Sequence, residues 1–524
     1  MKFTPTQEQL DCIEAAKVND NLKILACAGG TKTTTLSLIA EAIVEPSIYL
    51  AFNKSTALEA AQRFPKHVSP MTTHSAAYKA CGVDIQHKLS RPVGKYVNVA
   101  GTGSEIARYF KINSLDDPHV SANFVGLLVK RTVERFEQSV DKKIEAHHVP
   151  MYELPKEFQK DAKVNKYIRD FAKKLWERRI TPDSYILATH DTYLKLFQLS
   201  KPRLTGKVLY VDEFHDTTDC VLDIVRNQSH MKTIVVGDRF QNIYGWRGAK
   251  NALDDFDVHT CYLTQSFRYG QAVADIANKV LEGKTNIKGF DKIKSVVGRN
   301  VVDTTKPYTH LFRTNSALLL AAISNIEKGI PTLISIDTRD FVKILQSAIA
   351  LSEGDIKNVK HERILPFSEF KELQEEGKHD GELNRIAAAI KNGQARKMIQ
   401  ILETYKVPAN PIATFTTAHK VKGLEYDQVI LADDFPSHYG KKGAWVGLTE
   451  GERNLLYVAA TRAKKVLETN DSIEEVLERR RTHMDAIINP TYDLLSEMAL
   501  EGLNGHDVGH PHSDDVQDYT IHGE

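Results

Sequence analysis

Short apolar runs alternate with amphipathic stretches in two separate blocks of the chain. In the first block this pattern predicts strands at residues 22–28, 47–52, 206–212 and 232–238, and helices at 33–43 and 55–64. In the second block it predicts strands at 310–315, 332–336, 412–417 and 427–433, and a helix at 316–328. Strands that alternate with helices are typical of a mostly parallel sheet covered on both faces. We therefore expect an α/β fold with two such sheets.

A long polar stretch of helical character interrupts each block, so each α/β domain is expected to carry an insertion. The predicted organisation is a first α/β domain at 1–78 and 196–260, a helical insertion at 79–195, a second α/β domain at 261–338 and 407–481, a short helical insertion at 339–406, and an acidic tail at 482–524. The tail becomes rich in Gly, His and Asp, so we expect disorder at least from residue 502.

The charge of the chain is unevenly distributed. The 524 residues carry a net charge of +1, but residues 482–524 contain nine acids and no Lys or Arg, so the remainder carries +10. A basic body suits a polyanionic partner, although a solvated surface with an acidic tail explains the charge equally well. The five cysteines are scattered without a C-x-x-C pair, which favours a reducing compartment. We expect no signal peptide and no membrane span.

The strongest local signal is the segment ACAGGTKTTTL, residues 26–36, in which a strand, a glycine turn and a helix follow one another. Such a turn holds phosphate with backbone N–H groups, with a lysine on the β- and γ-phosphates and a hydroxyl on Mg²⁺. The residues expected to bind nucleotide here are Ala28, Gly29, Gly30, Thr31, Lys32, Thr33 and Thr34. An ordinary Gly-Gly turn is the alternative, because Ala26 and Thr31 stand where the motif has Gly.

Thr31 decides how well this loop can work. If Thr31 adopts a positive φ, a β-branched residue is strained there by about 1–3 kcal/mol. If Gly30 takes the unusual dihedral angles instead, the loop shifts by one residue at little cost.

Two further segments carry polar residues at the ends of predicted strands. In VLYVDEFHDTT (208–218), Asp212 is expected to bind Mg²⁺ and Glu213 to activate the attacking water. In VVGDRFQNIYGWRGA (235–249), the aromatic and basic residues Tyr244, Trp246 and Arg247 suit base stacking on single-stranded nucleic acid. A core tryptophan beside a solvated arginine is the alternative explanation of the second segment.

The order of these motifs resembles that of superfamily 1 DNA helicases of the UvrD/Rep/PcrA type, and most closely the helicase region of F-box DNA helicases. The further segments that carry the resemblance are TPTQEQ (4–9), LAFNKSTALEAA (50–61), TTHSAAY (72–78), LTQSFRYG (263–270), TAHKVKGLEYDQVILADDF (417–435) and ERNLLYVAATRAKK (452–465). The resemblance implies two RecA-like P-loop domains. The second insertion is much shorter than in UvrD-type enzymes, and no F-box fits before residue 1, so ubiquitin-ligase recruitment is not expected.

The resemblance also implies roles for individual residues. Gln7 would read adenine, Phe267 would stack on it and Glu425 would bind the ribose. The implied catalytic set is Lys32, Asp212, Glu213, Gln241, Arg268 and Arg462, the last three on the γ-phosphate, with Thr33 and Asp212 as ligands of Mg²⁺. The implied DNA-binding residues are Phe52, Asn53, His74, Tyr244, Trp246, Arg247, His419 and Lys422.

From these residues we expect an ATP- and Mg²⁺-dependent helicase or translocase that moves 3′→5′ on single-stranded DNA in replication, recombination or repair. Its expected partners are single-stranded DNA and single-strand/duplex junctions, with single-strand-binding or recombinase proteins as candidates, and we expect a monomer without membrane contact. The expected compartment is the cytoplasm, or the nucleus in a eukaryote. Two alternatives remain: an ATPase that strips protein from DNA without efficient unwinding, and a DNA-binding module that has lost hydrolysis through Thr31.

The charge distribution predicts how DNA binding responds to salt and to the tail. Binding of a labelled oligonucleotide, followed by fluorescence anisotropy, should weaken steeply with salt because Lys and Arg contacts release counterions. Removing residues 482–524 deletes nine acids and should strengthen binding at low salt, with the two proteins converging at high salt. Equal affinities with and without the tail would show that it never approaches the DNA.

Overall fold

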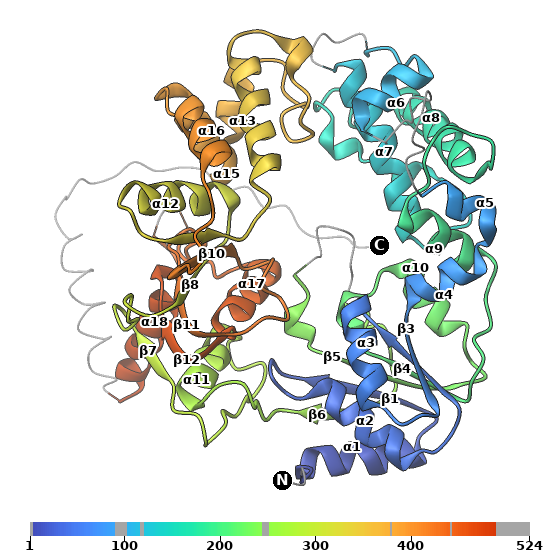
Figure 1. Ribbon diagram of the computed structural model, residues 1–524, viewed down its shortest axis with the longest axis vertical. Coiled ribbons are helices and arrows are strands. Elements are labelled where there is room, and N and C mark those ends of the chain that lie inside the picture. Colours follow the sequence, from blue (N-terminus) through green and yellow to red (C-terminus); the bar gives the residue numbers. More distant parts are fainter. Residues whose placement is uncertain are drawn as a thin grey trace, which may run out of the picture. The chain divides into compact units, whose positions relative to one another are not determined.

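The first α/β half is built on one parallel sheet. The computed structural model describes residues 4–89, 102–115, 120–243, 251–377, 380–440 and 443–488 (Figure 1). The sheet has six strands in the order β3-β2-β4-β5-β1-β6. Their bounds are β1 Asn21–Ala26, β2 Ser47–Ala51, β3 Val68–Thr72, β4 Val208–Val211, β5 Lys232–Gly237 and β6 His259–Leu263. The central strands β2 and β4 are buried along their whole length, which is why they read as unbroken apolar runs.

Two hydrophobic clusters cover the two faces of this sheet. One face packs Leu36 of α2 and Cys12 of α1 against Ile24 of β1. The other packs Phe214 and Leu222 against alternate residues of the same strands. The helices flanking the sheet are α1 Gln7–Val18, α2 Lys32–Ala42, α3 Lys54–Arg63, α4 Thr73–Ala80 and α10 Asp219–Arg226.

The second α/β half repeats this plan. Its six strands are parallel and lie in the order β7-β12-β11-β8-β10-β9. Their bounds are β7 Val296–Gly298, β8 Tyr308–Phe312, β9 Thr332–Ile334, β10 Ala413–Thr417, β11 Tyr426–Leu431 and β12 Ala463–Glu468. The accompanying helices are α11 Gln271–Val280, α12 Asn315–Glu327, α17 Glu450–Ala460 and α18 Asp471–Ile488. The predicted fold class, two parallel sheets with flanking helices, is confirmed.

The sequence pattern missed four strands, β3, β6, β7 and β12. Three of them lie at sheet edges, where one side faces solvent and the apolar run is diluted by polar residues. β6 pairs with β1 from Leu22↔His259 to Ala26↔Leu263, so it belongs to the first sheet. We therefore propose that the first domain ends after Leu263, instead of at the predicted boundary after residue 260.

Helices fill both predicted insertions. The first contains α5 Gly82–His87, α6 Gly103–Phe110, α7 Ala122–Gln138, α8 Ala162–Ile180 and α9 His190–Leu199. The second contains α13 Thr338–Ser352, α14 Phe370–Gly377, α15 Gly381–Lys391 and α16 Ala395–Thr404. The segment predicted to be disordered, 502–524, lies outside the described residues. No helix in the described part of the chain is long and apolar enough to cross a membrane.

A buried ion pair joins three helices of the first insertion. Arg179 of α8 donates to both carboxylate oxygens of Glu137 of α7 at 3.1 Å, and Thr192 of α9 donates to the same carboxylate at 2.6 Å. The two charged side chains are 3% and 0% exposed. Burial raises the pKa of Glu137, and Arg179 opposes that rise. The pair is therefore needed to keep the carboxylate charged inside the insertion.

Replacing Arg179 by Met should destabilise the first insertion by about 3–5 kcal/mol, because the Glu137 carboxylate then stays buried without its cation. The measurement is the urea midpoint of the transition that includes this insertion. The matched control is Lys166→Ala in the same helix, which removes an exposed pair with Asp170 and should change stability by less than about 0.5 kcal/mol. Equal midpoints for the two variants would contradict a structural role for the buried pair.

Candidate functional site

The predicted phosphate loop lies between the end of β1 at Ala26 and the start of α2 at Lys32. Gly29 has a φ of +78°, and a Cβ there would lie 2.5 Å from Ser266 Oγ and 2.8 Å from Arg268 Cβ. The backbone N–H of Phe267 donates to Gly29 O at 3.0 Å, and Ser266 Oγ donates to Ala28 O at 2.8 Å. The glycine thus lets the 266–268 segment pack directly against the loop, which brings Arg268 to the place where phosphate is expected.

Thr31 carries the unusual dihedral angles of this loop. Its φ of 54° and ψ of 38° are left-handed, whereas Gly30 does not have a positive φ. Gly30 is instead required by space, because a Cβ there would lie 2.9 Å from Cys27 O. Of the two possibilities that the sequence allowed, the structure therefore has the one in which a β-branched residue is strained, by about 1–3 kcal/mol.

Gln9 of α1 supports Thr31. Its Nε2 donates to Thr31 Oγ1 at 3.0 Å and to Thr35 Oγ1 at 3.2 Å, and its side chain is buried. Gln7, the predicted adenine reader, is exposed and donates to Asp11 at 2.8 Å. The structure thus brings Gln9 to the loop, and Gln7 keeps its role only as a prediction. The capping box formed by Thr6 and Gln9 is the signal that could have found it, because it fixes the side chain of the third helical residue.

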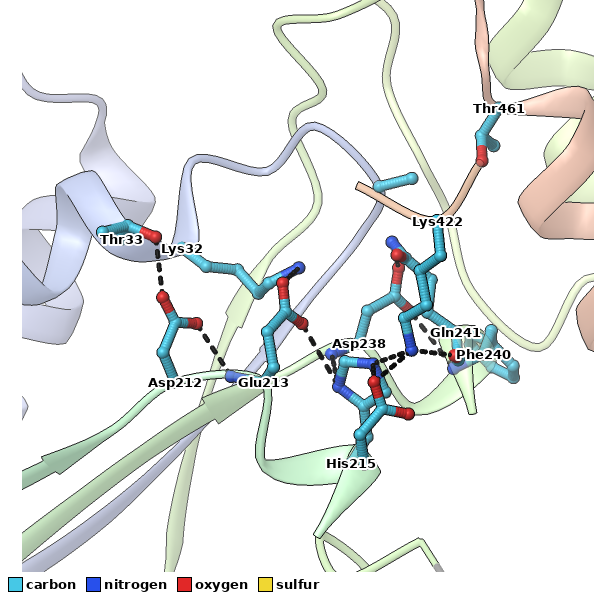
Figure 2. A network of polar contacts seen from close by, with 12 residues as sticks. Lys32, Thr33, Asp212, Glu213, His215, Asp238, Phe240, Gln241, Lys422 and Thr461 are labelled. Atoms are coloured by element: carbon cyan, nitrogen blue, oxygen red, sulfur yellow. Dashed lines mark hydrogen bonds and ion pairs between the residues drawn. The ribbon is translucent and has the colours of Figure 1, made fainter. Parts of the chain in front are cut away.

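Three predicted catalytic residues and the predicted metal ligand Thr33 converge beside the loop (Figure 2). Thr33 Oγ1 donates to Asp212 Oδ2 at 2.7 Å, and Lys32 Nζ lies 3.3 Å from Glu213 Oε1. Burial and the neighbouring Glu213 raise the pKa of Asp212. Burial disfavours a charged Lys32, but the surrounding carboxylates outweigh it and raise its pKa. A hydroxyl and a carboxylate at this distance are the hard oxygen donors that suit Mg²⁺.

Glu213 has backbone angles that few residues other than glycine adopt. Its φ is 51°, and its Oε2 is buried without a hydrogen-bond partner in the described part of the chain. Non-glycine residues with left-handed angles cluster at functional sites, where surrounding structure maintains the strain. A buried carboxylate oxygen with an unused lone pair is suited to accept a proton from a bound water.

The two predicted arginines lie close together in different surroundings. Arg268 Nε donates to Glu425 Oε2 at 3.0 Å and Arg268 Nη1 to Thr461 O at 3.3 Å. Arg462 is fully buried and donates to the backbone oxygens of Val458 and Leu424 and to the hydroxyl of Thr461. Burial, and secondarily Arg268, lower the pKa of Arg462 to about 9. The charge of a buried guanidinium is not neutralised when its hydrogen bonds go only to neutral oxygens, so such a group favours the binding of an anion.

Lys422 links the second half to the catalytic strand ends of the first half (Figure 2). Its Nζ forms an ion pair with Asp216, donates to Gln241 O at 2.6 Å and lies 3.0 Å from His215 Nε2. Burial lowers the pKa of Lys422 and raises the pKa of Asp216 to about 6. The structure therefore places Lys422, predicted on the DNA track, in a buried network; its DNA contact stays a prediction.

The short segment 238–242 is held by further residues of the second half that sequence reasoning missed. Tyr457 of α17 donates to Asp238 Oδ2 at 3.0 Å and accepts the Ala28 N–H at 2.9 Å, and Asn454 donates to Asn242 O at 3.1 Å. Their motif, ERNLLYVAATRAKK, gave a functional role only to Arg462. Tyr457 stands among the apolar residues of a buried helix, so no sequence signal distinguishes it from its neighbours.

Three of the remaining predicted residues line two cavities. Phe52 and His74 line a cavity of about 440 Å³ together with Asp216, and His419 lines another of about 1170 Å³. Asn53 caps α3 by accepting the Thr56 N–H at 2.8 Å. The Phe267 ring lies 5.1 Å from that of Phe290. Tyr244, Trp246 and Arg247 lie outside the described residues.

A second group of metal-ligand type lies in the first insertion. Within the described residues, ligand atoms of Asp141, His147 and His148 lie within 4.8 Å of one another. His148 Nδ1 accepts the Glu145 N–H at 2.9 Å, which leaves the ring proton on Nε2, the atom that faces Asp141 at 3.1 Å. An N–H donor cannot coordinate a metal, so this group is a hydrogen-bonded cluster.

Comparison with known proteins assigns the family. The UvrD-like helicase C-terminal domain matches residues 132–469, more than half of the chain, and the UvrD/REP helicase N-terminal domain matches residues 6–255. This chain belongs to the UvrD-like helicase family. The predicted resemblance is therefore confirmed.

Three relatives match this chain over segments of different length. F-box DNA helicase 1 of Gallus gallus is 30% identical in a match 508 positions long that covers 88% of this chain and 48% of that protein. F-box DNA helicase protein 1 of Schizosaccharomyces pombe is 30% identical over 90% of this chain and 58% of its own length. ATP-dependent DNA helicase PcrA of Leuconostoc citreum is 38% identical over 112 residues, 19% of this chain and 14% of that protein. The chain thus spans about half the length of its F-box relatives.

The geometry of the loop predicts opposite tolerances at two neighbouring positions. Gly30→Ala should weaken nucleotide binding by about tenfold or more, because its Cβ would meet Cys27 O at 2.9 Å and displace the loop. Thr31→Gly should change nucleotide affinity by less than about threefold, since relief of backbone strain offsets the lost hydrogen bond from Gln9. The measurement is titration with a fluorescent ATP analogue. Gly451→Ala, whose Cβ would meet nothing within 4 Å, is the control; a tolerated Gly30→Ala would contradict this loop geometry.

Proposed function

We propose that this chain is an ATP-driven motor that moves on single-stranded DNA and separates duplex at single-strand/duplex junctions. The observation that carries the proposal is that Arg268, whose segment packs against the phosphate loop, meets the buried Arg462 at Thr461, to which both arginines donate. Two guanidiniums at one point repel each other, and their proximity is compensated when a multiply charged anion lies between them. The γ-phosphate of ATP, held by the loop, supplies that charge.

Each remaining residue has a role in hydrolysis. Lys32 would neutralise the β- and γ-phosphates, and Gln241 would sense the γ-phosphate. Glu213 would take the proton as water attacks the γ-phosphorus and the bond to the β–γ bridging oxygen breaks, which leaves ADP and inorganic phosphate. Thr33 and Asp212 would hold Mg²⁺, which supplies charge neutralisation to the phosphates when bound. The strained backbone of Glu213 supports this assignment, because it is maintained by the fold and not by the side chain's own preference.

Coupling to DNA would run through contacts between the two halves. Lys422 and Tyr457, both from the second half, bind the 238–242 segment, which continues directly into Tyr244, Trp246 and Arg247. A change in the fit of the halves during hydrolysis would therefore be transmitted to the residues proposed to stack on bases. Stacking tolerates any base, as a motor that steps along DNA requires.

Movement in the 3′→5′ direction and a role in replication, recombination or repair are part of the same proposal. The names of the similar proteins, DNA helicases all three, support the choice of DNA. A motor of this kind would act where DNA is, in the cytoplasm of a bacterial or virus-infected cell or in a eukaryotic nucleus. Protein removal from DNA without efficient unwinding remains a second candidate, and single-strand-binding or recombinase proteins are the partners that it would meet. A monomer suffices, because each proposed catalytic group comes from one chain.

Lys32→Ala should abolish DNA-stimulated ATP hydrolysis while single-stranded DNA binding survives, because Lys32 pairs with Glu213 in the carboxylate site. Phosphate release and oligonucleotide anisotropy measure the two properties separately. A wild-type protein without ATPase activity would instead favour a module that has lost hydrolysis through the strain at Thr31.

A second experiment separates the two motor functions. Wild-type protein is given ATP with a duplex bearing a 3′ or a 5′ single-stranded tail, and in parallel with a single strand coated by a recombinase. The proposal expects displacement of the strand from the 3′-tailed duplex. Release of the coating protein without strand displacement would select the protein-removal candidate, and displacement from only the 5′-tailed duplex would overturn the direction.

A further inference from the structure

Tyr457 belongs to α17 in the second half, but its hydroxyl reaches the phosphate loop of the first half. The side chain is fully buried, and the hydroxyl both accepts the Ala28 N–H at 2.9 Å and donates to Asp238 Oδ2 at 3.0 Å. A tyrosine hydroxyl has one proton, and both an ionised carboxylate and a backbone N–H have fixed roles. The direction of both hydrogen bonds is therefore determined by their partners.

Asp238 connects Tyr457 to Gln241. Gln241 Nε2 donates at 2.7 Å to the same carboxylate oxygen that receives the Tyr457 hydroxyl. Because a carboxylate only accepts, the amide nitrogen of Gln241 must face Asp238, and its carbonyl oxygen is turned away from Asp238. Burial raises the pKa of Asp238, while Lys32, Gln241 and Tyr457 oppose that rise. Tyr457 thus helps to keep the carboxylate ionised and the amide of Gln241 in one orientation.

The same helix also determines the place of Arg462. α17 ends at Ala460, and Arg462 donates back to the carbonyl oxygen of Val458 in its last turn at 2.8 Å. When α17 is seated against the phosphate loop, the Tyr457 bridge and the Arg462 guanidinium are in position together. When it is not, Ala28 loses its hydrogen-bond acceptor and Asp238 loses one donor.

We propose that Tyr457 is a positioning residue for ATP hydrolysis, which orients Gln241 through Asp238 only while the second half is docked on the phosphate loop. This proposal rests on the proposed ATPase function. It predicts that the Tyr457 hydroxyl contributes to the rate of hydrolysis more than to ATP affinity, because neither this hydroxyl nor the Asp238 carboxylate is expected to touch ground-state nucleotide. A tyrosine that merely fills the core would change stability and ATP affinity instead.

The test compares Tyr457→Phe with wild type. DNA-stimulated kcat should fall about tenfold or more, the effect of a lost hydrogen bond to a charged group, while the KM for ATP changes less than about threefold. In a Gln241→Ala background the same substitution should lower kcat by less than about twofold, because residues that act as a unit are not additive. Independent, multiplying effects, an unchanged kcat, or a KM that rises as far as kcat falls would each overturn the proposal.

The matched control is Tyr405→Phe. The Tyr405 hydroxyl also accepts a backbone N–H and donates to an oxygen, both of Thr332, but Tyr405 follows α16 at the end of the second insertion, outside the nucleotide site. Tyr405→Phe should leave kcat unchanged although it lowers stability as much as Tyr457→Phe does. The thermal midpoint of each variant measures that loss of stability. A comparable loss of kcat in Tyr405→Phe would show that the assay reports general destabilisation, and the Tyr457 proposal would fall.

Binding measurements keep this proposal separate from the ATPase proposal. If wild type hydrolyses no ATP, the proposed function fails, and affinity for ADP with aluminium fluoride, a mimic of the transferring phosphoryl group, decides the role of Tyr457. Tyr457→Phe should weaken that complex about tenfold, with ADP alone changed by less than about threefold. Equal changes for both probes, or no change in either, would overturn the positioning role.

Discussion

Charge buried without full neutralisation is the constraint on which the rest of this structure depends. Arg462 is completely buried with hydrogen bonds only to neutral oxygens, and Asp238 is completely buried with donors that are neutral groups. Keeping such groups ionised is costly in a medium of low polarity, and the cost is reduced by every oriented dipole around them. The helices, strand ends and loop of the site place their polar groups so that they point toward these buried charges.

The same constraint explains why the two halves meet where they do. Contacts from Lys422, Asn454 and Tyr457 fall on residues 238–242 of the first half, and Lys422 and Tyr457 also reach Asp216 and Ala28. They supply donors to the backbone oxygens of Gln241 and Asn242 and add one donor to the Asp238 carboxylate. The interface is therefore polar and specific, and its geometry is set by hydrogen-bond directions more than by apolar contact.

The sequence predicted the central part of the fold better than its edges, for a physical reason. β2 and β4 are buried on both faces and appear as unbroken apolar runs, whereas β6 and β7 are edge strands with exposed residues and were missed. The motif around Lys32 and Thr33 located the loop, but it could not tell whether Gly30 or Thr31 has the positive φ. Gln9, His215 and Tyr457 escaped because their importance lies in contacts with residues distant in sequence, which no local pattern records.

The two arginines differ in how they are attached to the phosphate loop. Arg268 follows β6, a strand of the first sheet, and its neighbours Ser266 and Phe267 are bonded to the loop backbone. Arg462 comes from the opposite half and donates to oxygens of that half, at Val458, Leu424 and Thr461, where it meets Arg268. Arg268 is thus held at the loop by its own domain, whereas Arg462 is in place only when the two halves are in contact. Under the proposed function, nucleotide would bind to the loop and Arg268 whether or not the halves are in contact, and Arg462 would complete the site only when they are. The connectivity of the chain would then set the order of events in each cycle.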